Sequence, residues 1–365
     1  MTRTFSWAVL TSLLVHATTT TITSIHAWPS EELNAREYKL LLNASLFATS
    51  STNDDSLKQR ETTILAVVSE LQRDLTKAAA SVQAAGIAGE FQLKHDTPRW
   101  VRYWDTPGTC VLRKNEMILR MRQSCNKKRN GDDDDAWEGT LKTRNGDRYH
   151  TTARASYVKG CNEDVADQEK PKLEEDVSRY DWTGSTFSYS QDCEFVPTLL
   201  PEDSQNTLQM IGSVWRHSQE LLQKELGLDM SMPLAMVSNQ TITEVAYDDF
   251  WIYLDAQDYG GDEAKAQAKL TLWYKTKEGL DLDGGKLPRF TGSGDPILAE
   301  LKLRIKSKHE EWTDATIMNM HRFYEHCGKA LAGKWLDSKS MTKTAWIYKY
   351  NPTFCDPEED DGESS

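Results

Sequence analysis

Residues 299–306 read Ala-Glu-Leu-Lys-Leu-Arg-Ile-Lys, an alternation of apolar and charged side chains with a period of two. Side chains at positions i, i+2 and i+4 of a β-strand share one face, so this segment would place its aliphatic residues on one side and its charges on the other. The charged side would consist of Glu300, Lys302, Arg304 and Lys306. The pattern predicts a strand with a strongly positive polar face.

The same alternation recurs in four earlier segments, residues 90–94, 118–122, 140–144 and 148–154. Further strands are expected over 250–255 and 268–275. The polar faces of residues 299–306 and of the four earlier segments together carry ten Lys and Arg residues but only two carboxylates. The charged residues on these faces are Glu90, Lys94, Arg120, Arg122, Lys142, Arg144, Arg148, Arg154, Glu300, Lys302, Arg304 and Lys306.

Two interpretations explain this accumulation of positive charge. Solvated faces of ordinary antiparallel strands are common, but such faces should mix both signs in a chain with 43 Lys and Arg, 56 Asp and Glu and a net charge of −13. The alternative is a barrel whose apolar face lies under helices and whose cationic face lines a hydrated interior that binds a polyanion. Its interior must hold water, because burying an unpaired ion costs several kcal/mol. The charge pattern alone leaves both interpretations open.

The N-terminus has the features of a secretory signal peptide. Arg3 precedes an apolar stretch from Phe5 to Ala17, which is shorter than the ~20 residues of a membrane span, and small residues at possible cleavage positions follow. We therefore expect removal of residues 1–27, a secreted or lumenal protein and no membrane span thereafter, with a signal anchor as the alternative. Acceptor sequons at Asn43 and Asn239 predict glycosylation in that compartment.

The six cysteines predict up to three disulfides in a secreted chain, with 15 possible connectivities. Proximity in the sequence favours Cys110–Cys125, Cys161–Cys193 and Cys327–Cys355, although other pairings stay open. Because no Cys-x-x-Cys pair is present, a structural zinc site is not expected.

Helices are expected over 31–47, 56–85, 205–226 and 313–331. The first two would form an N-terminal helical segment (residues 28–86) without chemistry of its own. Residues 87–350 would form the domain that carries the strands, and residues 351–365 an acidic C-terminal tail.

The stretch Tyr103-Trp-Asp-Thr-Pro107, followed by Leu119-Arg-Met-Arg122, resembles the signature of the CYTH superfamily, the triphosphate tunnel metalloenzymes. Thr140-Leu-Lys142 is similar to the next strand of that family, and residues 296–302 stand where a late strand usually ends in Glu-x-Glu. The resemblance covers most of the chain after the helical segment. It implies an α+β fold, a largely antiparallel eight-stranded β-barrel or tunnel with flanking helices.

The resemblance also implies site residues. Tunnel cations would bind a triphosphate or a similar polyanion, and carboxylates would hold Mg²⁺ or Mn²⁺, so that both stabilise charge on a transferring phosphoryl group. The substrate-binding residues would be Lys94, Arg120, Arg122, Lys142, Arg144 and Arg154, with Lys302 and Arg304 on the last strand. Glu90 and Glu300 would be catalytic metal ligands, and Glu174 a third carboxylate for the metal.

Two departures from the family pattern concern the metal. The family's opening motif is Glu-x-Glu-x-Lys, whereas residues 90–94 have Gln92 in the second position, and Lys302 replaces the second Glu of the late strand. Hard divalent ions prefer several anionic oxygen ligands, so each change lowers metal affinity and favours a bare anion. Glu174 or Asp176 could supply the missing carboxylates if their strand lines the tunnel.

Two functions are consistent with these residues. One is a secreted, metal-dependent triphosphatase or polyphosphatase, and the other is a non-catalytic polyanion-binding or interaction protein on the same scaffold. In both cases the expected partner is a small anion such as triphosphate, polyphosphate or a nucleotide. The acidic net charge argues against specific nucleic-acid binding.

Overall fold

The computed structural model describes residues 32–48, 56–82, 86–94, 98–124, 136–164, 166–168, 170–177, 185–197, 200, 206–237, 241–257, 263–275, 295–306, 312–337 and 342–356. The proposed signal peptide (residues 1–27), Asn239, Cys125 and residues 357–365 of the expected acidic tail lie outside these ranges.

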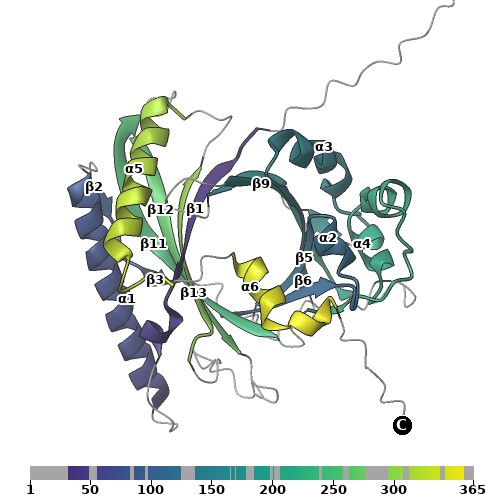
Figure 1. The fold of residues 1–365 in the computed structure, drawn as a ribbon, viewed down its shortest axis with the longest axis horizontal. Coiled ribbons are helices and arrows are strands. Elements are labelled where there is room, and N and C mark those ends of the chain that lie inside the picture. Colours follow the sequence, from purple (N-terminus) through teal and green to yellow (C-terminus); the bar gives the residue numbers. More distant parts are fainter. Residues whose placement is uncertain are drawn as a thin grey trace, which may run out of the picture.

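Nine strands form a closed barrel (Figure 1). Around the barrel they follow the order β4 (Arg99–Asp105), β5 (Met117–Ser124), β6 (Trp137–Asn145), β9 (Ser185–Phe195), β8 (Lys172–Val177), β1 (Ala35–Leu42), β13 (Leu298–Lys306), β12 (Glu263–Lys275) and β11 (Ile242–Gln257). β11 pairs back with β4 and closes the ring. The short strands β2 (Gly86–Ala88), β3 (Gln92–Leu93), β7 (Ala166–Gln168) and β10 (Ala235–Met236) pair with the ring strands β11, β9 and β4.

The barrel is largely antiparallel, as expected, but its nine strands correct the expected number of eight. β1 pairs antiparallel with β13 on one side and parallel with β8 on the other. A closed ring in which every neighbour runs in the opposite direction needs an even number of strands. A ring of nine strands must therefore contain a parallel pair, and here that pair is β1–β8.

The prediction of a helix over residues 31–47 is wrong, because residues 35–42 form β1 and residues 44–47 a short 3₁₀ turn. The segment is rich in residues that favour helices, but pairing with partners on both sides overrides this local preference. Tyr38 and Leu40 pack into the core outside the barrel, whereas Glu37 and Lys39 face the interior. The segment expected to lack chemistry therefore contributes two charged residues to the barrel interior.

Two other predicted strands also differ. Residues 148–154 lie in helix α3 (Arg148–Val158), which Asp147 caps by accepting hydrogen bonds from the backbone N–H groups of Tyr149 and His150. Of residues 90–94, only Gln92 and Leu93 form a strand, which pairs with β11. The predicted strands at 118–122, 140–144, 250–255, 268–275 and 299–306 are confirmed.

Helices cover the outside of the barrel on two sides (Figure 1). Helices α1 (Ser56–Ser81) and α5 (Asp314–Leu331) lie along β11 to β13, and confirm the helices expected there. On the other side, α3, α4 (Leu208–Val214) and the π-helical segment Glu220–Glu225 cover β6 and β9. The apolar strand faces thus lie beneath the helices, which leaves the polar faces for the interior.

The last helix, α6 (Lys343–Tyr350), lies inside the ring of strands (Figure 1). Its C-terminal end leads to the 3₁₀ turn Pro352–Phe354 and to Cys355, which forms a disulfide with Cys110 at the start of α2 (Val111–Lys114). This pairing corrects both the Cys110–Cys125 and the Cys327–Cys355 predictions. The predicted Cys161–Cys193 disulfide is confirmed, and Cys327 is a buried free thiol. None of the described helices is long and apolar enough to cross a membrane.

Candidate functional site

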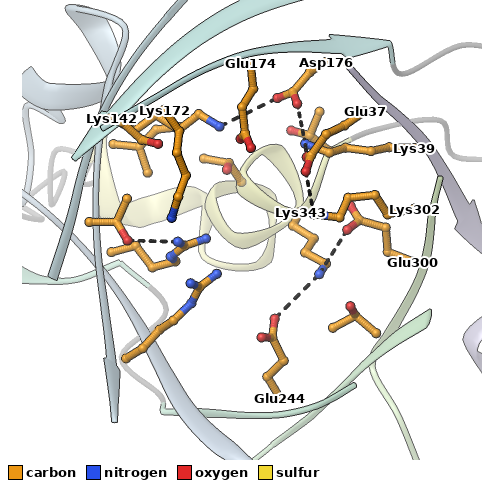
Figure 2. Close-up of a pocket in the computed structure, with 18 of the residues that line it drawn as sticks. Glu37, Lys39, Lys142, Lys172, Glu174, Asp176, Glu244, Glu300, Lys302 and Lys343 are labelled. Atoms are coloured by element: carbon orange, nitrogen blue, oxygen red, sulfur yellow. Dashed lines mark hydrogen bonds and ion pairs between the residues drawn. The ribbon is translucent and has the colours of Figure 1, made fainter. Parts of the chain in front are cut away.

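The barrel encloses a polar cavity of about 390 Å³ (Figure 2). Twelve Lys and Arg side chains and seven Asp and Glu side chains line it, in a protein whose whole chain is acidic. The cations are Lys39, Lys94, Arg99, Arg120, Arg122, Lys142, Arg144, Lys172, Lys269, Lys302, Arg304 and Lys343, and the anions are Glu37, Glu138, Glu174, Asp176, Asp192, Glu244 and Glu300. The described lining therefore carries an excess of positive charge.

The two signs are distributed unevenly around the ring. The wall formed by β4, β5 and β6 presents five cations and one carboxylate to the cavity. The wall formed by β8, β1 and β13 presents four cations and four carboxylates. We call these the cationic wall and the mixed wall. An anion in the cavity is attracted to the first wall, whereas the second carries equal numbers of positive and negative groups.

Glu37 on the mixed wall is held by two ammonium groups (Figure 2). Its carboxylate lies 2.6 Å from Lys302 Nζ and 2.9 Å from Lys39 Nζ. Burial opposes ionisation of this group, but the charges of Lys302, Lys39 and Arg304 outweigh burial and hold the Glu37 pKa well below its usual range. Glu37 is therefore an anion at neutral pH.

Asp176 is surrounded by three cations from two strands, β1 and β6. Its carboxylate lies 2.6 Å from Lys39 Nζ, 3.4 Å from Arg144 Nη2 and 3.8 Å from Lys142 Nζ. Burial again opposes ionisation, and the neighbouring cations again prevail, so the Asp176 pKa is lowered. This aspartate connects the mixed wall to the cationic wall.

Arg120 on the cationic wall has a different environment. Its Nη2 donates to Thr140 Oγ1 at 2.9 Å, and the same hydroxyl donates to Asp192 at 2.6 Å. Within the part of the chain that the structure describes, no carboxylate lies within 4.0 Å of the Arg120 guanidinium, and its buried Nε has no hydrogen-bond partner. Burial and the adjacent Arg122 lower the pKa of Arg120. The Arg122 Nε is likewise buried and unpartnered, although Arg122 Nη1 lies 2.8 Å from Glu138.

The carboxylates do not present a preformed site for Mg²⁺ or Mn²⁺. Among the described residues, no group of three or more Asp, Glu, His or Cys side chains is arranged to hold a metal. Glu37 and Asp176 share Lys39, Glu174 lies 2.6 Å from Arg304, and Lys343 stands between Glu300 and Glu244. Lysine and arginine thus occupy the coordination directions that a hard divalent ion would need.

Nine of the residues expected at the site line the cavity. They are Lys94, Arg120, Arg122, Lys142, Arg144, Glu174, Glu300, Lys302 and Arg304. The structure does not bring Glu90 or Arg154 to them. Glu90 is exposed beside β3, because residues 90–94 are not a barrel strand. Arg154 lies on α3, where its Nη1 donates to the backbone carbonyl of Asn115 at 2.6 Å.

Sequence reasoning missed several lining residues, among them Glu37, Lys39, Lys269 and Lys343. The sequence does contain a pattern that could have identified Glu37 and Lys39. Glu37-Tyr-Lys39 matches the second Glu and the Lys of the Glu-x-Glu-x-Lys motif, which was assigned to residues 90–94 instead. Lys269 lies in a predicted strand whose polar face holds few charges. Lys343 belongs to a helix, so sorting strand faces cannot find it.

No protein-family model and no curated protein sequence matches the chain. Solved structures do. A Hippeastrum protein, HpAC1, described as an adenylyl cyclase with a dominant triphosphatase activity, aligns over 87% of this chain and 95% of its own at 11% identity and a TM-score of 0.34. A Bacillus halodurans protein described as an adenylate cyclase aligns over 81% of this chain and 91% of its own at 11% identity and a TM-score of 0.28.

Proposed function

We propose that the protein binds a compact oligophosphate anion inside the barrel: triphosphate, a short polyphosphate, or the phosphate chain of a nucleotide. The observation that carries the proposal is Arg120, a half-buried guanidinium that faces the cavity with no carboxylate within 4.0 Å in the described structure. Burial and the adjacent Arg122 lower the pKa of Arg120, although Asp192 and Glu138 oppose the shift, so keeping its positive charge at this position costs free energy. An anionic ligand that pairs with the cation removes this cost.

The class of anion follows from the arrangement of the cations. Five of them line adjacent strands of the cationic wall, so they suit a chain of linked anionic groups better than a single carboxylate. Arginine guanidinium groups match phosphate oxygens by donating two parallel hydrogen bonds. The cavity of about 390 Å³ lies at the lower end of the ~300–1,000 Å³ range of small-molecule sites.

Binding should not require a divalent metal, because ammonium and guanidinium groups already neutralise the carboxylates. In a calorimetric titration, we expect tripolyphosphate to bind equally well in EDTA and, at matched ionic strength, in low millimolar Mg²⁺. The affinity should fall steeply with added salt, since charge drives it. Binding that occurs only with Mg²⁺ or Mn²⁺ present would contradict this expectation, and no binding under either condition would overturn the proposed function.

Hydrolysis of the bound anion is the second candidate function. The convergence of Glu37, Glu174, Asp176 and Glu300 on the mixed wall favours it, because carboxylates facing bound phosphates are the groups that hold Mg²⁺ or Mn²⁺ in phosphoryl-transfer enzymes. Displacement of Lys302 or Lys343 would have to precede metal binding there. Phosphate release from tripolyphosphate or ATP with Mg²⁺ or Mn²⁺, abolished in Glu37→Gln but not in Glu90→Gln, would support it. Absence of turnover across these substrates and metals would leave binding as the function.

Lys269 gives the binding a dependence on pH. Burial lowers the Lys269 pKa to about 7, although Glu244 opposes the shift. The ammonium form, which attracts anions, is therefore present below pH 7 and is lost as the pH rises through 7. We expect the affinity of the wild type, divided by that of Lys269→Arg, to fall between pH 6 and pH 8. The ratio cancels the titration of tripolyphosphate itself, and a constant ratio would contradict the assignment.

The expected secretory location belongs to the same proposal. Two disulfides in the described residues are typical of proteins that fold in an oxidising compartment. Oligophosphates and released nucleotides are the corresponding ligands outside the cell. The Asn43 sequon is in a described turn, where the Asn43 side chain accepts a hydrogen bond from the Ser45 N–H.

A further inference from the structure

Helix α6 brings charge into the barrel from outside the strand framework. Thr342, Lys343 and Thr344 line the cavity at its first turn. Lys343 Nζ lies 3.0 Å from Glu300 and 3.6 Å from Glu244, on two different strands (Figure 2). It also lies 5.3 Å from the centre of the Trp273 ring. Every other cation in the described lining lies on a strand or directly beside one, so α6 supplies the one cation from a helix.

The other end of α6 is fastened to the Asp-Thr-Pro turn. Tyr348 donates its hydroxyl proton to Asp105 at 2.7 Å, and Asp105 also accepts hydrogen bonds from the backbone N–H groups of Thr106, Leu112 and Arg113. The Arg113 guanidinium stacks on the Tyr348 ring at 4.7 Å. Asp105, which has no exposed surface, therefore fixes both its own turn and the helix that enters the barrel.

A disulfide strengthens this attachment. Cys355 is bonded to Cys110, three residues beyond Pro107 in the same turn, and the Gly108 N–H donates to the Phe354 carbonyl at 2.7 Å. The Asn351 side chain donates to the Val237 carbonyl at 2.8 Å. Because α6 has only eight residues, its stability depends on these tertiary contacts rather than on the helix itself.

We propose that the Cys110–Cys355 disulfide and the Asp105–Tyr348 hydrogen bond are positioning elements for anion binding, which act by holding Lys343 in the barrel. The inference rests on the proposed oligophosphate function. With the disulfide intact, Lys343 adds its charge to the cavity and neutralises Glu244 and Glu300. When the attachment is loosened, the ammonium group withdraws and two carboxylates face the incoming anion, so binding weakens. The Asp-Thr-Pro turn thereby affects affinity without contacting the ligand.

The test compares tripolyphosphate affinities of variants by calorimetry. We expect Lys343→Gln to weaken binding by about tenfold or more, as for loss of one charged hydrogen bond, and Lys343→Arg to retain most of it. The double variant Cys110→Ser/Cys355→Ser should weaken binding by a similar factor. The matched control is Cys161→Ser/Cys193→Ser, which removes the other disulfide and should change affinity less than twofold if the protein is folded. Tyr348→Phe, a milder change that keeps the disulfide, should give a smaller loss.

The decisive comparison removes the disulfide and Lys343 in the same protein. If the disulfide acts through Lys343, its removal in the Lys343→Gln background should cost less than a further twofold. Additive losses, or an unchanged affinity in the Cys110→Ser/Cys355→Ser variant, would overturn the inference. Hydrogen exchange of the α6 amides, expected to accelerate in that variant and in Tyr348→Phe, gives a readout independent of ligand, and unchanged exchange would also overturn it. Failure of the wild type to bind tripolyphosphate would instead overturn the proposed function.

Discussion

Replacing Arg120 with methionine should lower tripolyphosphate affinity by about 10- to 100-fold and leave the free energy of unfolding unchanged or higher. The affinity falls because a charged, cavity-facing donor pair worth up to ~3 kcal/mol is lost. Stability does not fall, because no carboxylate lies within 4.0 Å of this half-buried guanidinium in the described structure, and its removal relieves both its desolvation and its repulsion with Arg122. Thr140 keeps its hydrogen bond to Asp192.

The measurement pairs calorimetric titration with urea unfolding of the same samples. Arg154→Gln is the control, since Arg154 lies on α3 outside the cavity and its loss should leave affinity within twofold of the wild type. A variant at Arg120 that binds normally would refute the placement of the anion on the cationic wall. A large loss of stability would show that the guanidinium has a structural partner instead.

Asp176→Asn should lower the stability of the protein and raise its affinity for tripolyphosphate, the opposite of what is expected for the methionine variant of Arg120. Removing this carboxylate leaves Lys39, Lys142 and Arg144 without their shared anion, and breaking a buried ion pair in this way costs about 3–5 kcal/mol of stability. The same change adds one net positive charge to the cavity, so we expect tripolyphosphate affinity to rise by about tenfold or more. Millimolar tripolyphosphate should then raise the melting temperature of the variant more than that of the wild type.

The matched control is the preceding residue on the same strand. Glu175 points to the opposite face of β8 and pairs with Arg36 at 2.9 Å. Glu175→Gln should lower stability without raising affinity, which separates the loss of an ion pair from the gain of positive charge in the cavity. Equal affinities for the wild type and Asp176→Asn would argue that the anion binds elsewhere.

The buried carboxylates of the cavity also determine how the stability of the protein falls at acidic pH. Glu37, Asp176 and Glu244 all have lowered pKa values in the folded protein. Their contribution to stability is present above the ordinary carboxylate pKa of about 4 and is lost as the pH falls through the lower folded values.

The sequence predicted which residues face the barrel interior better than it predicted which segments form the barrel strands. Period-two sorting of residues 118–122, 140–144 and 299–306 gave the correct inward faces, because a strand that buries one face must alternate. It failed at residues 148–154, where the same alternation occurs on a capped helix, and at residues 90–94, where a short apolar and polar run forms only an edge strand.

The first barrel strand and the helix inside the barrel could not be predicted for separate reasons. Residues 35–42 have helix-forming composition, and only distant partners reveal their extended structure. Lys343 acts through tertiary placement of α6, which local pattern does not encode. The Cys110–Cys355 pairing spans 245 residues, so sequence proximity pointed to nearer partners.

The parallel β1–β8 pair affects how the chain is made as well as how it binds. Arg36 meets its partner Glu175 across 139 residues, and Glu37 meets Lys302 across 265. β1 therefore gains one neighbour only when β8 has been synthesised, and the other much later, when β13 has been synthesised. Such distant pairings fold slowly and leave an open strand edge exposed in the meantime. Late pairing of β1 with β8 and β13 should therefore limit the rate of folding.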